Sequence, residues 1–238
     1  MNALPVLFMT KETDGRDRVA ESTMTALKVY LEECNSKPLF FYLAVAGSMA
    51  YLEKLVRILE NQGFTGRYFF MQFEEATAGY AWNQLVKKIF DDGHEMYLRM
   101  EDDFVLKQPL NISPYIELLE TKGNVGMVRL GLMPINLNLF SVGWYDQGNN
   151  GHIFFDCLPS TSYAYSGNPG LVHKRLHDAV GYFHEQHNPG NIEIDFDSRV
   201  RAKMVDGGPR IWWPLELGKY GTYGPWNHIG QVKSYKEN

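Results

Sequence analysis

Three consecutive carboxylates, Glu101, Asp102 and Asp103, interrupt a stretch of sequence that is otherwise apolar. Like charges this close repel one another unless a cation or a proton lies between them. Residues 96–100 have the composition of a buried strand, and apolar character resumes at Val105. An ordinary surface turn would more often contain Gly, Pro or Asn at this point. The pattern therefore favours a site for a divalent metal, with a solvated acidic turn as the alternative.

A second acidic segment, residues 192–197, alternates apolar and acidic residues and reads Ile-Glu-Ile-Asp-Phe-Asp. Alternation of this kind predicts an extended segment in which Glu193, Asp195 and Asp197 share one face. Such a face would bring three carboxylates together. The alternatives are an edge strand with a solvated face, or a cap that Asp195 gives to the helix after it.

The elements that must position these acids are clearest in the first half of the chain. Apolar runs predict strands at residues 4–10, 39–46, 67–73 and 95–100, and helical spacing predicts helices at 19–34, 49–61 and 79–90. Strands that alternate with helices imply right-handed crossovers and a parallel sheet covered by helices on both faces. Such sheets bind ligands at the carboxyl ends of their strands. The carboxylates at 101–103 should therefore lie at that edge, together with residues 10–18, 47–48 and 72–77.

The second half is less regular, and it shows no repeats or linkers, so one domain over residues 1–238 is expected. Strands are predicted at 125–130, 152–158 and 162–166, a long loop at 131–151, and a turn at 167–170 that opens a helix over 171–187, with a further helix at 198–205. Arg129 ends one of these strands beside the acidic edge, where it could pair with a phosphate or an acid.

Composition excludes several classes of protein. The 238 residues are 45% hydrophobic, which is enough for a sizeable core, and the net charge of −5 argues against binding nucleic acid by charge alone. Cys34 and Cys157 are the only cysteines, which indicates a reducing compartment. The first ten residues do not resemble a signal peptide, and no apolar run is long enough to span a bilayer. We therefore expect a cytoplasmic protein without membrane insertion.

With these motifs in order, the chain resembles the nucleotide-sugar glycosyltransferases of the GT-A fold. Residues 98–106 resemble the Glu-Asp-Asp form of that family's DxD motif, and a second acidic motif and a late histidine, His228, follow in the expected order. The resemblance implies an α/β fold: a Rossmann-like, mostly parallel sheet flanked by helices with an elaborated C-terminal acceptor half. Residues 1–106 would form the half that binds the nucleotide sugar, and residues 107–238 the half that binds the acceptor.

The resemblance also implies the chemistry. Asp103 would be the primary ligand of Mn2+ or Mg2+, with Glu101 and His228 as further metal ligands, and Glu101 and Asp102 would hold ribose or metal-bound water. A divalent cation in this place stabilises the charge of a diphosphate leaving group. Glu193, or Asp195 as the second choice, would be the base that deprotonates the acceptor hydroxyl. A carboxylate base implies an inverting single displacement, although a retaining mechanism stays open.

Contacts to the donor, a nucleotide sugar and in the first instance a UDP-sugar, are implied more loosely. They comprise Thr10, Glu12 and Arg16 after the first strand, Gly47 and Ser48 after the second, Asn83 in the segment 79–83, and Arg129. The acceptor would be a hydroxyl of a surface glycan, a protein or a modified DNA base, and Trp or Tyr side chains at 144, 145, 212, 213, 220, 223 and 226 could stack against it. Two alternatives remain. A nucleotidyltransferase on the same fold would need a loop rich in Lys and Gly after the first strand, and residues 11–18 contain one Gly. A sugar- or nucleotide-binding protein without activity is the other.

Overall fold

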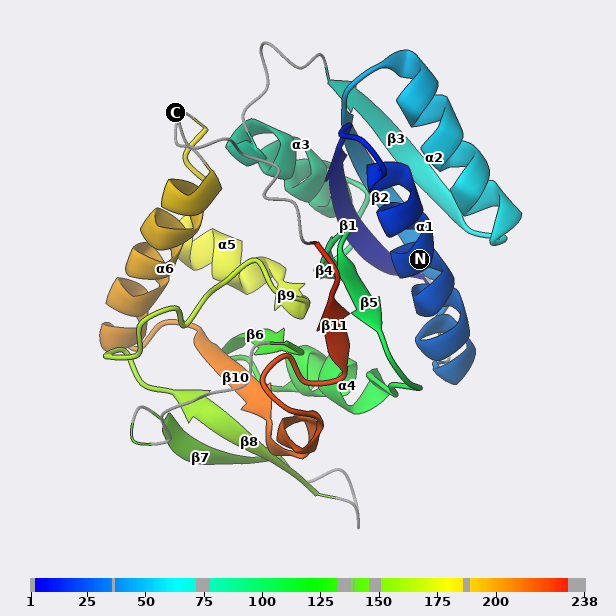
Figure 1. Cartoon of the computed structure of the whole chain (residues 1–238). Helices are drawn as coiled ribbons and strands as arrows, with labels where there is room; N and C mark the ends of the chain where they lie inside the picture. Colours follow the sequence, from blue (N-terminus) through cyan, green and yellow to red (C-terminus); the bar gives the residue numbers. More distant parts are fainter. Residues whose placement is uncertain are drawn as a thin grey trace.

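A nine-stranded sheet forms the centre of the computed structural model, which describes residues 3–35, 37–71, 78–131, 138, 140–145, 151–185 and 189–230 (Figure 1). In sheet order its strands are β3 (Thr65–Met71), β2 (Leu39–Ala46), β1 (Leu4–Lys11), β4 (Met96–Glu101), β9 (Gly170–His173), β6 (Val125–Arg129), β10 (Arg210–Pro214), β8 (His152–Cys157) and β7 (Phe140–Tyr145). Only β9 and β8 run against the direction of the other strands in this sheet. The sheet is therefore mostly parallel.

Six helices accompany the sheet, and a small second sheet lies beside it. The helices are α1 (Arg16–Tyr30), α2 (Met49–Asn61), α3 (Ala78–Asp91), α4 (Ser113–Thr121), α5 (Lys174–Val180) and α6 (Pro189–Val205), with short 3-10 turns η1 (Glu32–Cys34) and η3 (Leu215–Tyr220). The small sheet pairs β5 (Phe104–Leu106) with β11 (Trp226–His228) in antiparallel fashion. These counts refer to the described residues.

The first four strands have the order β3-β2-β1-β4, so the chain moves outward from β1 to β3 and then returns to the other side of β1. Ligands of such sheets bind where the strand order reverses, at the carboxyl ends of the strands. Here that point lies between β1 and β4, which are parallel, with Met9 opposite Glu101. Thr10 at the end of β1 and the carboxylates after β4 are thereby brought to the same edge.

Local sequence explains why these elements form. β1 and β2 are almost continuously buried, as expected for parallel strands with helices on both faces. α2 begins at an N-cap, Ser48, whose side chain accepts a hydrogen bond from the Tyr51 amide, and it stops before Gly63, whose φ is +75°. Right-handed crossovers place α1 and α2 on one face of the sheet and α3 on the other (Figure 1).

The structure confirms every strand and helix predicted before residue 104, with shifts of a few residues at their ends. In the second half it confirms the strands predicted at 125–130 and 152–158 and corrects other elements. Residues 162–166 form no strand, and the helix predicted over 171–187 is instead strand β9 followed by the short α5. The predicted loop at 131–151 contains β7, and the acidic segment 192–197 belongs to α6, which begins at Pro189. β9 forms because Leu171 and Val172 fill the gap between β4 and β6, where a helix has no room.

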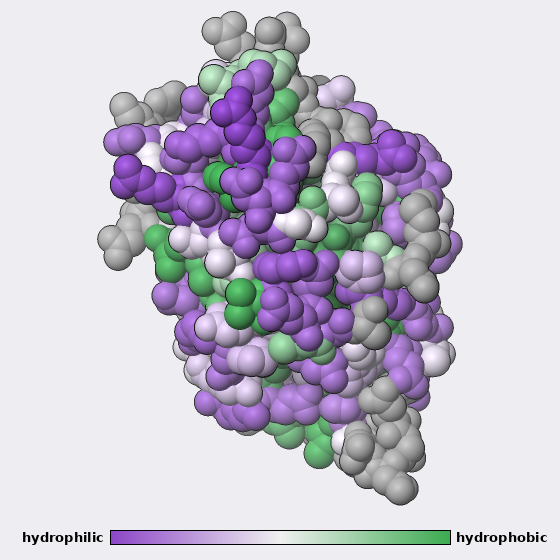
Figure 2. All heavy atoms as spheres, turned by 90° about the vertical axis from the view of Figure 1, so that its right-hand side faces the viewer, coloured by the Kyte–Doolittle hydropathy of each residue, from purple (hydrophilic) through white to green (hydrophobic). Residues whose placement is uncertain are grey.

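The face that carries α1 and α2 is mostly hydrophilic, with hydrophobic residues visible in small separate areas (Figure 2). Within the described part of the chain, none of the helices has the length and apolar character that a membrane crossing requires. Both cysteines are free thiols, and Cys157 is buried.

Candidate active site

The turn after β4 places Asp103 against the small β5–β11 sheet. Asp103 is buried, and its Oδ2 atom lies 3.3 Å from Nε2 of His228. β11 brings His228 there because it pairs with β5, where His228 lies opposite Phe104 and stacks on its ring at 4.7 Å. The Ile229 amide donates a hydrogen bond to the Asp103 carbonyl, and a Cβ at Gly230 would collide with the Asp103 carboxylate. The predicted pair of Asp103 and His228 is therefore brought together by chain segments far apart in sequence.

This pair fits a divalent cation. The second carboxylate oxygen of Asp103, Oδ1, is buried and has no hydrogen-bond partner among the described residues. A buried carboxylate oxygen without a partner is costly, and a cation would satisfy it. Carboxylate oxygen suits Mg2+ and Mn2+, imidazole nitrogen suits transition metals, and such ions often use only one or two protein ligands beside substrate phosphates.

Asp102 faces the other way and is already neutralised. It is 2% exposed, and it accepts hydrogen bonds from Thr10 Oγ1 at 2.5 Å and from Arg16 Nε at 2.6 Å. Arg16 also lies 3.1 Å from Asp103 Oδ2 through its Nη2 atom. Burial alone would lower the pKa of Arg16, but its hydrogen bonds to the two carboxylates raise that pKa above its usual range. Asp102 thus anchors the turn, and the ribose contact expected for it has no free face here.

Glu101 belongs to a different cluster, formed with Arg99 and Glu193. Nη2 of Arg99 lies 3.3 Å from Oε1 of Glu193 and 3.8 Å from Oε1 of Glu101. Withdrawal from water raises the pKa of Glu101, Arg99 opposes this, and the charge of Glu193 adds to it. The three side chains place two carboxylates around one guanidinium beside the β4 terminus.

Aromatic rings hold Arg99 in position. Its guanidinium carbon lies 4.2 Å from the centre of the Trp82 ring, 5.2 Å from Tyr165 and 5.9 Å from Phe183. The Tyr165 hydroxyl accepts a hydrogen bond from Nη1 of Arg99, which is 2% exposed. A guanidinium that stacks between rings keeps its charge in a buried place, so Arg99 presents a fixed cation to Glu193.

Gly167 forms the wall behind this cluster. A Cβ at this position would overlap Oε1 of Glu193 and Oε1 of Glu101, and would lie 2.8 Å from Nη2 of Arg99. Both carboxylate oxygens therefore lie against the same face of Gly167. Only a residue without a side chain leaves room for them.

The two predicted base candidates separate because the acidic segment is helical. Residues two apart on a helix are rotated by about 200°, so Asp195 points away from Glu193 and Asp197. The prediction that all three share one face is therefore wrong. Glu193 turns toward Arg99, whereas Asp195 is paired with Arg199 at 2.7 Å and 2.9 Å on another side of α6. Glu193 is therefore better placed than Asp195 to act as the base.

Glu12, Gly47 and Ser48 do meet at the ends of β1 and β2. The Glu12 carboxylate accepts hydrogen bonds from the Ser48 amide at 2.5 Å and from the Ser48 hydroxyl at 3.0 Å. A Cβ at Gly47 would lie 2.5 Å from the Cβ of Glu12, so Gly47 permits this close approach. Together these residues form a polar ledge beside the turn that carries Asp102 and Asp103.

Asn83 and Arg129 lie inside the protein. The Asn83 amide is 2% exposed and exchanges two hydrogen bonds with the Phe183 backbone, so it fastens residues 183–185 to α3. Arg129 is fully buried and donates to the carbonyls of Tyr163 and Ala164 and to the Ser166 hydroxyl. It pairs with neither an acid nor an open phosphate position, which corrects the expectation for this residue. Burial lowers the pKa of Arg129 to about 10.

The described residues contain no group of three or more His, Cys, Asp or Glu side chains arranged to hold a metal ion. Asp103 and His228 meet, while Glu101 lies with Arg99 and Glu193. Residues 72–77, expected at the same edge, and the side chains of Trp144 and Tyr145 lie outside the described part. Trp212, Trp213 and Trp226 are buried in the core, which leaves Tyr223 exposed beside His228.

Sequence reasoning missed Arg99, Tyr165 and Gly167. Arg99 did carry a signal, because a charged residue in the middle of an otherwise apolar parallel strand must find a partner inside the protein. Gly167 belongs to the predicted turn at 167–170, but its contact with the Glu193 and Glu101 carboxylates has no local signal. Tyr165 has no local signal, since its role depends on Arg99 from a distant strand.

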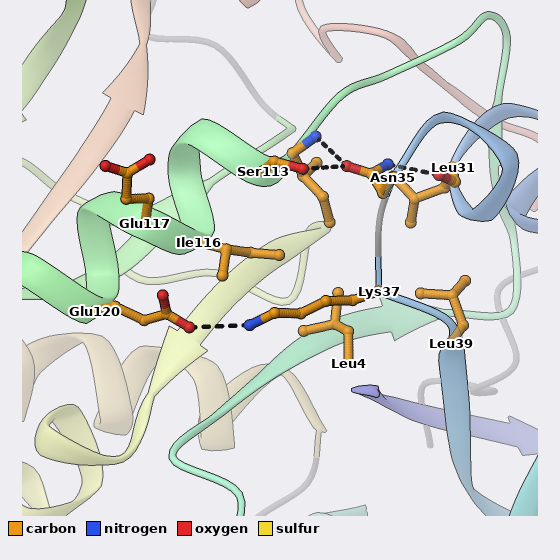
Figure 3. Close-up of a pocket in the computed structure, with 10 residues that line it drawn as sticks. Leu4, Leu31, Asn35, Lys37, Leu39, Ser113, Ile116, Glu117 and Glu120 are labelled. Carbon is orange, nitrogen blue, oxygen red and sulfur yellow. Dashed lines mark hydrogen bonds and ion pairs between the residues drawn. The ribbon is translucent and has the colours of Figure 1, made fainter. Parts of the chain in front are cut away.

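Two cavities outside this cluster lie at the opposite side of the sheet, near the amino end of β1. One, of about 190 Å3, is lined by Leu4, Leu31 and Ile116, and the ion pair of Lys37 with Glu120 at 2.9 Å crosses its rim (Figure 3). The other, of about 280 Å3, lies beside His94 and His173. Both are at the amino end of β1, away from the carboxylates, so neither supplies the candidate site.

Comparison with known proteins bears on the fold. No family model and no curated protein matches this sequence. A mannosyltransferase from Pyrobaculum calidifontis, solved in complex with GDP-Man and Mn2+, aligns with a TM-score of 0.56 at 12% identity over 92% of this chain and 58% of that chain. The inositol-1-phosphate CTP transferase from T. maritima aligns with a TM-score of 0.47 at 12% identity over 92% and 91% of the two chains. Glucosyl-3-phosphoglycerate synthase from Mycobacterium tuberculosis gives 0.46 at 12% identity over 83% and 68%.

At such low identity, the similarity to the mannosyltransferase concerns the fold alone. This chain spans 58% of the length of that protein. The shared feature is the mostly parallel sheet flanked by helices, and the α/β, GT-A-like fold class predicted from the sequence is confirmed.

Proposed function

We propose that this chain is a metal-dependent, inverting glycosyltransferase that moves a sugar from a nucleotide-sugar donor to a hydroxyl of an acceptor. One observation carries the proposal. The end of β4 joins two different sites within three residues: Asp103 lies with His228, while Glu101 lies with Arg99 and Glu193. We assign these two neighbouring places, at the reversal point of the sheet, to a cation and to a base.

Asp103 and His228 would hold the cation, and we place Glu101 beside the base. Bound there, Mn2+ or Mg2+ would stabilise the negative charge that develops on the diphosphate of the departing nucleotide. Arg16 keeps Asp102 neutralised and Asp103 in place. The unpartnered Oδ1 atom of Asp103 supports this assignment, because it is the one carboxylate oxygen of the turn that is buried without a partner.

Glu193 would act as the base. As the acceptor hydroxyl oxygen attacks the anomeric carbon, its proton passes to the Glu193 carboxylate, and the bond between that carbon and the phosphate oxygen breaks with its electron pair on the nucleoside diphosphate. Arg99 and the Gly167 wall fix the direction of the Glu193 carboxylate before the reaction. Positioning of this kind removes much of the entropic part of the barrier.

The donor would lie across the ends of β1, β2 and β4, with Glu12, Arg16, Gly47 and Ser48 beneath its nucleotide. Thr10 is 3% exposed and its hydroxyl is bonded to Asp102 and Tyr51, so it would support the turn rather than contact the donor. The sequence pointed to a UDP-sugar, and the mannosyltransferase that shares the fold was solved with GDP-Man. Both nucleotides therefore belong in a test. Asn83 is left out of the donor contacts because Phe183 occupies its amide.

A donor panel tests the proposal. The protein would be incubated with UDP- and GDP-sugars, with and without Mn2+, and release of free nucleoside diphosphate measured. We expect metal-dependent release from at least one donor. CTP with sugar phosphates belongs on the same panel, because pyrophosphate release from that mixture would show nucleotidyl transfer instead. Binding of nucleotides without any release would favour the non-catalytic alternative and contradict the proposal.

A further inference from the structure

The segment 163–166, which leads into Gly167, is held by two buried charges of opposite sign. From β6, Arg129 donates to the Tyr163 carbonyl at 2.6 Å, to the Ala164 carbonyl at 3.2 Å and to the Ser166 hydroxyl at 2.6 Å. From α6, Asp197 accepts from the Tyr163 amide at 3.2 Å and from the Tyr165 amide at 2.9 Å. Burying a charge is costly unless it is hydrogen-bonded, so these bonds commit two charged residues to fixing one short segment.

Tyr163 is the unusual residue of this segment. Its φ is +58°, and within the described residues it alone among the non-glycines has a positive φ. A side chain in this left-handed conformation strains the backbone, and glycine would adopt it more easily. Strain of this kind persists only where the surrounding structure imposes it, and it is common where ligands bind. Arg129 and Asp197 impose it here by holding the Tyr163 carbonyl and amide.

The Tyr163 side chain is not needed to fill the core, because 53% of the residue is exposed. A large ring is therefore kept on the surface at a position where glycine would fit the backbone better. Packing of the protein interior therefore does not explain why this position carries a phenol ring.

The segment 163–167 contacts α6, and its hydrogen bonds and close approaches relate Tyr163 to that helix. Gly167 lies against Glu193, and Tyr163 bonds to Asp197, four residues further along α6. Four residues are about one helical turn, or roughly 5.4 Å, which is close to the length of one sugar ring. The residue that holds the Tyr163 backbone is thus about one helical turn of α6 from the proposed base.

We propose that Tyr163 is a platform on which an acceptor stacks the sugar ring that neighbours its reacting hydroxyl. The inference rests on the proposed function and names its acceptor class as a carbohydrate of at least two rings. The apolar face of a pyranose can cover an exposed aromatic ring and remove it from water. A neutral acceptor is favoured because the nearby cations are already paired, Arg199 with Asp195 and Arg201 with Asp197.

Two variants at the same position test the inference. Tyr163→Gly removes the ring and suits the backbone, whereas Tyr163→Phe keeps the ring. Binding of maltose, cellobiose, lactose and diacetylchitobiose, and of the matching monosaccharides, would be measured by calorimetry with UDP or GDP and Mn2+ present. We expect at least one disaccharide to bind the wild type more tightly than its monosaccharide, and Tyr163→Gly to weaken that binding about fivefold or more. Tyr163→Phe should bind like the wild type.

Donor hydrolysis without acceptor separates this inference from the proposed function. Tyr163→Gly should release nucleoside diphosphate from the donor at the wild-type rate and melt at the wild-type temperature or above it, because glycine relieves the backbone strain. If the wild type does not hydrolyse any donor, the result contradicts the proposed function and not the role of Tyr163. Equal disaccharide binding by Tyr163→Gly and wild type, or no disaccharide preference in the wild type, would overturn the role of Tyr163.

Discussion

Three adjacent carboxylates have three different surroundings in this protein. Glu101 lies by Arg99, Asp102 is bonded to Thr10 and Arg16, and Asp103 is paired with His228. Repulsion between the like charges is relieved because Arg99 lies near Glu101 and Arg16 lies near both Asp102 and Asp103. The cluster that looks like one metal site in the sequence is therefore divided between two places, which the proposed function assigns to a cation and to a base.

The proposed base gives the first prediction. Glu193→Gln keeps the shape of the side chain but removes its capacity to take a proton, so sugar transfer should fall at least about a hundredfold. Binding of nucleoside diphosphate with Mn2+ should stay unchanged. Asp195→Asn, two residues away on α6, is the matched control and should retain most of the activity. Comparable losses in both variants would remove Glu193 from the role of base.

Gly167 gives the second prediction at this scale. Gly167→Ala places a methyl group where Oε1 of Glu193 and Oε1 of Glu101 now lie, so the base must move. Displacing a reacting group by about 1 Å can lower the rate on the order of a hundredfold. Transfer kinetics measure the loss, and Gly218→Ala is the control because a Cβ there meets no atom within 4 Å. Full activity in Gly167→Ala would contradict the packing described for this cluster.

At the scale of elements, α6 shows why the second acidic motif was misread. The order Ile-Glu-Ile-Asp-Phe-Asp has a period of two, which is typical of a strand. The buried residues of this helix follow a period of four instead: Ile192, Phe196, Val200 and Met204 are all at most 2% exposed. That longer spacing was present in the sequence and extended beyond the six acidic and apolar residues that were read alone.

The first half of the chain was predictable for a physical reason. β1, β2 and β4 are buried on both faces, so their sequences are apolar runs that only a strand of a parallel sheet explains. β9 and β11 are short and depend on neighbours that come from elsewhere in the chain. Leu171 and Val172 suit a helix and a strand equally well, and the gap between β4 and β6 decides between them.

The contact of α5 with β4 leads to a prediction about pH. His177 on α5 is buried, with its Nε2 atom 2.8 Å from the Tyr97 hydroxyl, and burial lowers the pKa of His177 to about 4. An unfolded histidine titrates near pH 6.5, so between these values the unfolded chain binds more protons than the folded one. Stability is therefore fully present above pH 6.5 and declines as the pH falls toward 4, by up to about 3 kcal/mol from this residue.

Urea unfolding at a series of pH values measures this effect. His177→Gln should show a shallower loss of unfolding free energy between pH 6.5 and 4 than the wild type. His173, whose pKa is also lowered to about 4 by burial, should preserve part of the slope in the variant. An identical slope in wild type and variant would show that His177 is not held neutral in the folded protein.

At the scale of the whole molecule, one sheet carries strands from both halves of the chain, and its strand order brings the residues of the proposed site to one edge. β4 and β9 pair side by side, so the end of β4 meets the segment 163–167 and α6 from the second half. The cavities near Leu4 and His94 lie at the other side of the sheet. These cavities are therefore separate from the proposed site.

The edge of the sheet and the position of Asp103 on it could be predicted from the sequence, because they follow from the order of strands and helices. The residues that contact this edge from elsewhere in the chain could not be predicted. His228 arrives through β11, a strand of three residues, and Arg99 meets Glu193 only after α6 folds back over the sheet. Such contacts join distant parts of the chain and leave no local pattern.

The central claim is that Asp103 holds a divalent cation for a nucleotide diphosphate, and calorimetric titration of UDP and GDP with and without Mn2+ tests it most directly. We predict that Mn2+ tightens binding of one of these nucleotides at least about tenfold in the wild type, as expected for a cation shared by carboxylate and phosphate. The effect should persist in Asp206→Ala, which removes an exposed acid after α6, and vanish in Asp103→Ala. The same metal effect in Asp103→Ala, or no metal effect in the wild type, would contradict the account.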